Sequence, residues 1–257
     1  MIYILIAVSS FLVAGLTFFS GFGLGTLLLP LFALFFPLPV AVAATAAVHL
    51  LNNISKVILV GKHADRRIFL IFGVPAVIAA MGGAWCLGYL SDMQPLFQYS
   101  MGKSTFEIFP VKLTIGTLMI IFALFELIPG MSRHSVSPKW IPLGGLLSGF
   151  FGGLSGHQGA LRTVFLTRAG LSKEALIGTI AFIGASVDIM RLIVYGSQRF
   201  SHAGSDVAVF VAIAAVSAWL GSFIGSRLLK KITLRTVRIL IGTMLLVLGS
   251  ALASGIV

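Results

Sequence analysis

Two glycine-rich stretches decide how this chain folds: Gly21-Phe22-Gly23-Leu24-Gly25 near the N-terminus and Gly152-Gly153-Leu154-Ser155-Gly156-His157-Gln158-Gly159 in the second half. They lie inside apolar segments near 2–36 and 141–171, which are both longer than the roughly 20 residues that cross a bilayer. Glycine weakens a helix by about 1 kcal/mol per residue relative to alanine, so we expect each segment to break in two. Irregular backbone at membrane depth is tolerated only when it is buried in protein or lines a cavity. The two breaks therefore mark a candidate site.

The composition around these stretches is that of a membrane protein. Hydrophobic residues make up 58% of the 257 residues and charged residues only 10%, whereas soluble chains are about a quarter charged. A soluble enzyme, a disulfide scaffold and a disordered chain are thereby excluded. The net charge of +11 would suggest nucleic acid in a soluble protein, but in a membrane protein basic residues gather in cytoplasmic loops. We expect no nucleic-acid partner, no cofactor and no metal, and the only cysteine, Cys86, cannot form a disulfide within the chain.

The basic loops set the expected topology. Further apolar segments lie near 41–60, 68–90, 108–128, 174–195, 206–226 and 236–256. The loops 61–67 and 227–238 are rich in lysine and arginine, so both should be cytoplasmic. Five apolar segments separate them, so one segment must cross the bilayer either not at all or twice. The glycine-broken segment 141–171 is the candidate, as a re-entrant hairpin or as two short crossings, and both termini then lie outside.

The two halves of the chain also resemble each other. Gly15 pairs with Gly149, Gly25 with Gly159 and Thr45 with Thr179 at one constant offset. We therefore expect an all-α polytopic membrane protein with two inverted repeats, each holding one glycine-broken segment and three transmembrane helices. The first repeat would span 1–128, a cytoplasmic linker 129–140 and the second repeat 141–257. Inverted repeats with broken helices are typical of secondary transporters, whose substrate site lies near the repeat interface.

The glycine stretches resemble the two signatures of the TauE/SafE sulfite-exporter family, the first running on through Thr26-Leu27-Leu28-Leu29-Pro30. The resemblance covers nearly the whole chain. It implies a multi-pass carrier of the bacterial inner membrane that moves a small sulfur-containing or related organic anion, of the sulfite, thiosulfate or sulfonate type. It also implies that the chain is not an enzyme.

Arg162 is the main candidate for binding that anion. It follows the second glycine break, where the first repeat has Leu28. A guanidinium can hold an oxyanion with two parallel hydrogen bonds, and the start of an adjacent half-helix adds free N–H groups. Gly23, Gly25 and Gly159 would let the backbone approach the anion. The alternative is an arginine that snorkels to the cytoplasmic surface.

Other polar residues in the apolar segments are candidates for the same site. His157 and Gln158 lie at the break, where the histidine either carries a proton with the anion or caps backbone groups. His49, Asn52 and Asn53 either line the cavity or form interhelical hydrogen bonds, with Asn52 aligned to Ser186 and Asn53 to Val187. Asp188 and Arg191 are three residues apart, so they share a helix face and can form an ion pair.

Some alternatives stay open at this point. An anion channel could use the same inverted scaffold, and Gly153-Leu154-Ser155-Gly156 matches the motif of rhomboid-type proteases, with Ser155 as nucleophile. No histidine is well placed to activate that serine. A homodimer is possible, because Gly221 and Gly225 form a helix-packing pattern that serves contacts within or between chains. We expect Lys56, Lys112 and Arg238 to snorkel, and Glu126 to be structural.

Overall fold

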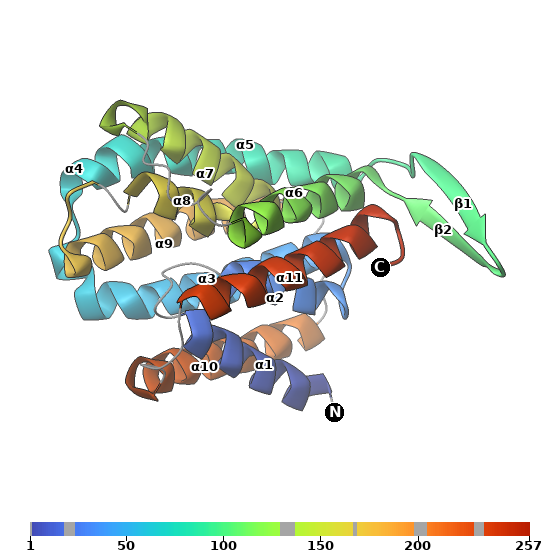
Figure 1. The fold of residues 1–257 in the computed structure, drawn as a ribbon, viewed down its shortest axis with the longest axis horizontal. Helices are drawn as coiled ribbons and strands as arrows, with labels where there is room; N and C mark the ends of the chain where they lie inside the picture. The colour runs from blue at the N-terminus through green and yellow to red at the C-terminus, as the bar shows by residue number, and fades with distance from the viewer. Residues whose placement is uncertain (1, 18–23, 129–136, 167–168, 198–204, 229–233) are drawn as a thin grey trace.

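The computed structural model describes the backbone of residues 2–17, 24–128, 137–166, 169–197, 205–228 and 234–257 (Figure 1). Apart from one hairpin, the described elements are helical. The principal helices are α1 Ile2–Thr17, α2 Leu24–Ala33, α3 Leu38–Val60, α5 Val74–Ser91, α6 Pro110–Leu127, α7 Ile141–Ser155, α8 Gln158–Leu166, α9 Lys173–Ser197, α10 Ser205–Leu228 and α11 Leu234–Ala253. The turn after α3 holds the short elements η1 Gly61–His63, α4 Arg66–Ile68 and η2 Phe69–Gly73, and η4 Pro138–Trp140 precedes α7.

Five helical stretches of the described chain are long and apolar enough to cross a membrane: Leu38–His63, Arg66–Ser91, Pro110–Leu127, Lys173–Ser197 and Val207–Ile224. Shorter apolar helices accompany them, at Tyr3–Thr17, Leu24–Ala33, Ile141–Ser155 and Arg238–Ala253. The protein is therefore a polytopic membrane protein.

The second glycine-rich segment is broken where the sequence predicted. Helix α7 ends at Ser155, and Gly156 has a φ of 79°, a left-handed conformation that glycine adopts at little cost. Its N–H caps α7 through the carbonyl of Gly152, and α8 begins at Gln158. The first segment consists of α1 and α2, and the residues between them, including Gly23, lie outside the described part of the chain.

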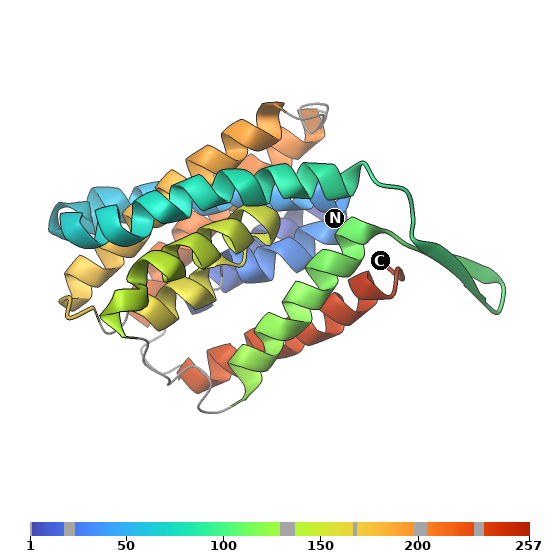
Figure 2. The same cartoon turned by 90° about the horizontal axis from the view of Figure 1, so that it is seen from above.

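Helix pairs far apart in the sequence pack side by side. Helix α3 packs against α9, α6 against α11, α5 against α7, and α1 against α10. Within the first two pairs the helices run in opposite directions (Figures 1 and 2). Glycines make these contacts close: a Cβ on Gly153 would overlap the backbone of α5 at Ala80, and a Cβ on Gly221 would overlap that of α1 at Phe11. Gly221 is thus used for packing within the chain.

A β-hairpin corrects the expectation of an all-α protein. Strand β1 Phe97–Met101 pairs antiparallel with β2 Ser104–Ile108 inside the predicted loop 91–107. Apolar and polar residues alternate along β1 in the two-residue period of a strand, and the tight turn is possible because Gly102 has a φ of 67°. The Tyr99 hydroxyl donates to the Ser254 carbonyl at 2.7 Å, which fixes the hairpin to the C-terminal end of the chain.

The chain termini and a basic turn lie at opposite ends of the helix bundle. Both chain termini lie at the end that carries the hairpin, and the turn from η1 to η2 lies at the opposite end (Figures 1 and 2). That turn exposes Lys62, Arg66 and Arg67. The relative arrangement is the one expected from the charge pattern, while the compartment that each end faces stays a prediction. Residues 129–136 and 229–233 of the other predicted cytoplasmic loops lie outside the described residues.

Two charged residues noted in the sequence, Glu126 and Arg238, form an ion pair away from the helix break. Arg238 Nε of α11 lies 3.8 Å from Glu126 Oε2 of α6. The pair joins two neighbouring helices, which fits the structural role expected for Glu126.

Candidate functional site

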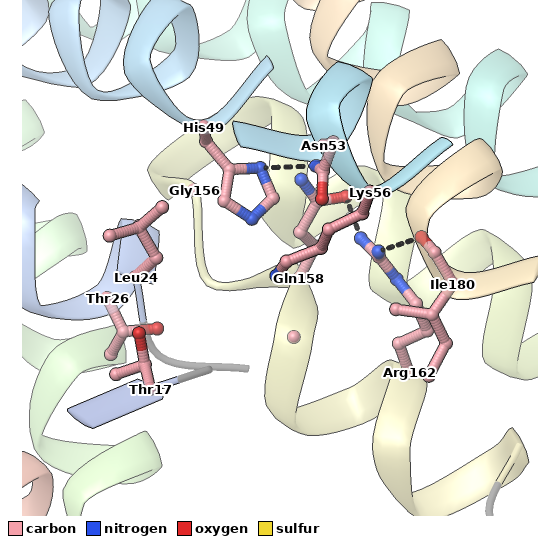
Figure 3. A pocket seen from close by; sticks show the side chains of 12 residues that line it. Thr17, Leu24, Thr26, His49, Asn53, Lys56, Gly156, Gln158, Arg162 and Ile180 are labelled. Atoms are coloured by element: carbon pink, nitrogen blue, oxygen red, sulfur yellow. Dashed lines mark hydrogen bonds between the residues drawn. The ribbon is translucent and has the colours of Figure 1, made fainter. Parts of the chain in front are cut away.

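A small cavity lies where the starts of α2 and α8 meet the middle of α3 (Figure 3). Its volume is about 20 Å³, enough for about one water molecule. The lining residues come from both halves of the chain: Thr17, Leu24, Gly25, Thr26, His49, Asn53, Lys56, Gly156, Gln158, Gly159, Arg162 and Ile180. Of the predicted site residues, the cavity brings together Gly25, His49, Asn53, Gln158, Gly159 and Arg162.

Arg162 is buried beside the cavity and does not extend to the membrane surface. Only 2% of it is exposed. Its Nη1 donates to the Ile180 carbonyl at 2.8 Å and its Nη2 donates to Gln158 Oε1, as Figure 3 shows. Its Nε is buried and has no hydrogen-bond partner among the described residues. Gly184 of α9 leaves room for this arrangement, because a Cβ there would lie 2.9 Å from Arg162 Nη1 and 2.6 Å from Asn53 Nδ2.

Asp188 is the centre of the polar network behind the cavity. The residue is fully buried, and its carboxylate accepts hydrogen bonds from three helices. Oδ2 lies 2.7 Å from His49 Nδ1 and 3.1 Å from Asn53 Nδ2, both on α3. Oδ1 accepts from Gln158 Nε2 of α8 and from Arg191 Nε of its own helix, each at 3.0 Å. The carboxylate therefore holds α3, α8 and α9 together.

Arg191 forms an ion pair with Asp188 and connects it to the helix break. Arg191 Nη2 lies 2.8 Å from Asp188 Oδ1, and neither residue is exposed. Arg191 Nη1 donates at 3.0 Å to the carbonyl of Gly152, in the last turn of α7. The hydroxyl of Tyr195, one turn further along α9, donates to the carbonyl of Gly153. These two side chains thus bind carbonyls at the broken end of α7.

Besides Asp188 and Arg191, two described residues that were predicted to bind the substrate, Asn52 and His157, do not line the cavity. Asn52 is buried on the other side of α3, where its Oδ1 accepts a hydrogen bond from the Ser222 hydroxyl of α10 at 3.0 Å. Of the two roles left open for Asn52, the structure therefore shows the interhelical hydrogen bond. Adjacent helical residues are about 100° apart, so Asn52 and Asn53 point in different directions, and only Asn53 lines the cavity.

The ring of His157 likewise lies away from the cavity. It stacks on Phe122 with a centroid distance of 5.4 Å and an interplanar angle of 3°. Its Nδ1 lies 3.0 Å from the hydroxyl oxygen of Ser155, and that hydroxyl donates to the carbonyl of Phe151. Ser155 is fully buried and only 1% of His157 is exposed, so neither side chain is open to a substrate from outside.

Lys56 is a site residue that the sequence analysis assigned to snorkelling. It lines the cavity next to Asn53 (Figure 3). The signal that could have found it is its spacing: His49, Asn53 and Lys56 are four and three residues apart, which places them on one face of α3. The threonines at 17 and 26 also line the cavity, and they too were missed.

The site carries more positive than negative charge. Among the described residues that line the cavity or belong to the Asp188 network behind it, Asp188 is the one carboxylate, against the cations Arg162, Arg191 and Lys56. The Asp188–Arg191 pair is neutral as a unit, which leaves Arg162 and Lys56 at the cavity. The guanidinium of Arg162 is buried, and a buried charge is costly unless it is compensated. The described residues contain no group of three histidine, cysteine or acidic side chains that could hold a metal ion.

Comparison with known proteins gives one result that covers most of the chain. The family model described as sulfite exporter TauE/SafE matches residues 6–252. Neither curated proteins nor solved structures gave a match. The described helices and this match agree with each other, because members of the family are membrane transporters rather than enzymes. The chain therefore belongs to the TauE/SafE sulfite-exporter family.

Proposed function

We propose that this protein is a secondary transporter that moves a small sulfur-containing anion, of the sulfite, thiosulfate or sulfonate type, across the bacterial inner membrane. The anion would bind in the cavity between α2, α3 and α8. One observation carries the proposal: the cavity is lined by Arg162 and Lys56, and the Arg162 Nε is buried without an acceptor among the described residues. A cation buried at membrane depth usually faces a substrate path.

The donors around the cavity suit an oxyanion. A guanidinium has five N–H groups, and two of the hydrogen bonds of Arg162 go to Ile180 and Gln158. The Nε and a neighbouring Nη group of Arg162 could therefore donate two parallel hydrogen bonds to the anion. Gly25 and Gly159 line the cavity in the first turns of α2 and α8, where half-helix starts present N–H groups and a partial positive charge.

The cavity volume of about 20 Å³ is too small for an anion of several heavy atoms, so side chains or helices must move for it to enter. We propose that the two halves are inverted repeats that move against each other. The helix packing supports this. Helix α5 of the first half packs on α7 of the second, and α10 of the second half packs on α1 of the first. Helices α1 and α7 each belong to a glycine-broken segment, so each half contacts the broken segment of the other half. The end with the hairpin would face outward, together with both termini.

The test is transport by purified protein in liposomes, with sulfite, thiosulfate, a sulfonate, sulfate and a carboxylate as substrates. Arg162→Leu should insert normally and lose at least about tenfold in saturable transport, because the buried cation is gone. Arg162→Lys should lose less, because it keeps the charge but not the planar fork. Lys112→Leu is the matched control, since Lys112 is a cation of α6 that lies over the Phe109 ring outside the cavity.

Two outcomes would contradict the proposal. An inserted Arg162→Leu variant that carries every anion at the parental rate would remove Arg162 from the site. Flux of the parent protein that rises without saturation and shows no counterflow would favour an anion channel in place of a carrier.

A further inference from the structure

His49 is the one residue of the described cavity lining whose side chain ordinarily titrates between pH 5 and 8. We infer that His49 is the proton-binding group of the site and that anion transport is coupled to proton transport through it. This inference rests on the proposed function. It assigns proton coupling to His49 of α3, whereas the sequence analysis considered this role for His157 at the helix break.

The hydrogen bonds of His49 fix which ring nitrogen can take up a proton. Its Nδ1 lies 2.7 Å from Asp188 Oδ2 and 3.0 Å from Asn53 Nδ2, and that amide nitrogen itself donates to Asp188 Oδ2 at 3.1 Å. An ionised carboxylate only accepts hydrogen bonds, and Asp188 is ionised because Asn53, Gln158 and the guanidinium of Arg191 all donate to it. Nδ1 therefore carries the hydrogen of the neutral ring, and Nε2 has the lone pair. In Figure 3 the second ring nitrogen points toward the cavity.

The charged groups around His49 make proton binding depend on the anion. Asp188 and Arg191 of α9 form a neutral pair behind the ring. Arg162 of α8 and Lys56 of α3 share the cavity with the ring and oppose a further positive charge, while the lining residues of α2 are not titratable. An anion bound between Arg162 and Lys56 offsets their charge, so a proton then binds His49 more readily. Linkage is reciprocal, and protonated His49 equally favours the anion.

The step balances without any other reactant. From one side of the membrane, His49 Nε2 takes a proton from water in the cavity as the anion binds. On the other side the anion leaves, the imidazolium returns the proton to water, and the neutral ring remains hydrogen-bonded to Asp188. His157 cannot serve in this way from its described position, because its ring is buried against Phe122 and does not line the cavity.

The test uses the full-length protein in liposomes with radiolabelled thiosulfate, whose charge does not change across the pH range used. Counterflow measures binding and movement of the anion, and accumulation driven by a pH difference, with the membrane potential set to zero, measures coupling. One proton per anion allows up to roughly tenfold accumulation per pH unit, since a tenfold ratio corresponds to about 1.4 kcal/mol. The variants are His49→Asn, whose amide nitrogen can replace Nδ1 as donor to Asp188, and His157→Asn as the control.

We expect the parent and His157→Asn to accumulate thiosulfate in the more alkaline compartment, driven by protons that move down the pH gradient. His49→Asn should bind thiosulfate more weakly, because the protonated ring no longer favours the anion, and it should lose accumulation driven by the pH difference while counterflow persists at saturating thiosulfate. Accumulation that persists in His49→Asn overturns the inference, and so does a loss of counterflow at saturating thiosulfate in both His49→Asn and His49→Gln, because His49 would then be required for movement of the anion itself. Parent counterflow without accumulation counts against this inference alone, whereas a parent without counterflow counts against the proposed function and this inference together.

Discussion

Replacing either Asp188 or Arg191 alone should lower the free energy of unfolding by several kcal/mol, because the remaining partner is left as a buried charge without a counter-charge. Asp188→Asn keeps the shape of the side chain, but it leaves Arg191 without a counter-charge in a fully buried position. It also turns an amide nitrogen toward donors that now bind the carboxylate, among them His49, Asn53 and Gln158. Breaking a buried ion pair costs about 3–5 kcal/mol, so we expect a loss of about 4 kcal/mol.

The partner change should cost somewhat less, and the double change should show that the two residues act as a pair. Arg191→Met leaves Asp188 with three uncharged donors, so we expect a loss of about 3 kcal/mol, at the lower end of the range for buried pairs. Independent sites would then give about 7 kcal/mol for the double variant. We expect about 4–5 kcal/mol, because residues in contact couple by up to about 3 kcal/mol.

The measurement is unfolding of purified protein in mixed micelles with increasing sodium dodecyl sulfate, followed by circular dichroism for the parent, both single variants and the double variant. Ser9→Ala, on a partly buried serine of α1 that bonds only to its own helix, controls for general effects of substitution. Losses that add within about 0.5 kcal/mol would refute the reasoning, since distant, independent residues behave in that way.

Two further predictions concern the cavity and the topology. Gly184→Ala should lower thiosulfate affinity in a binding assay at least about tenfold, because its Cβ would lie 2.6 Å from Asn53 Nδ2; Gly82→Ala, which meets nothing within 4 Å, should leave the affinity unchanged, and equal effects would contradict the contact argument. In a Cys86→Ala background, a cysteine at Ser100 of the hairpin should react with an impermeant label from the outside and one at Lys62 from the inside. Labelling of both from one side would contradict the predicted orientation.

The second helix break and most of the cavity could be predicted from the sequence because their signals are local. Glycine density marks the end of α7 at Gly156, and a charged residue inside an apolar segment is conspicuous wherever it occurs. Arg162, His49 and Asn53 were found in this way, and they line one cavity. The helical spacing of Asp188 and Arg191 predicts the ion pair between them, since residues three apart share a face.

The direction of individual side chains could not be predicted, because it depends on helices distant in the sequence. Asn52 and Asn53 are chemically identical, and only the positions of α9 and α10 decide that Asn53 bonds to Asp188 and Asn52 to Ser222. The ring of His157 follows the left-handed turn at Gly156 and packs on Phe122 of α6. The hairpin was missed because it is short and lies between long apolar segments that dominate the pattern.

The helix break and the candidate site depend on each other through a chain of unsatisfied groups. Ending α7 inside the membrane frees carbonyls in its last turn, and these need donors because no lipid group can supply them. Tyr195 donates to the freed carbonyl of Gly153, and Arg191 adds a second donor to the carbonyl of Gly152, which the Gly156 N–H also caps. A buried guanidinium in turn requires an anion. Asp188 provides that anion, and its remaining lone pairs orient His49 and Gln158. Gln158 then accepts from Arg162 and fixes its guanidinium beside the cavity. A change at Asp188 should therefore disturb the helix break and the anion site together, even though its carboxylate lies behind the residues that line the cavity.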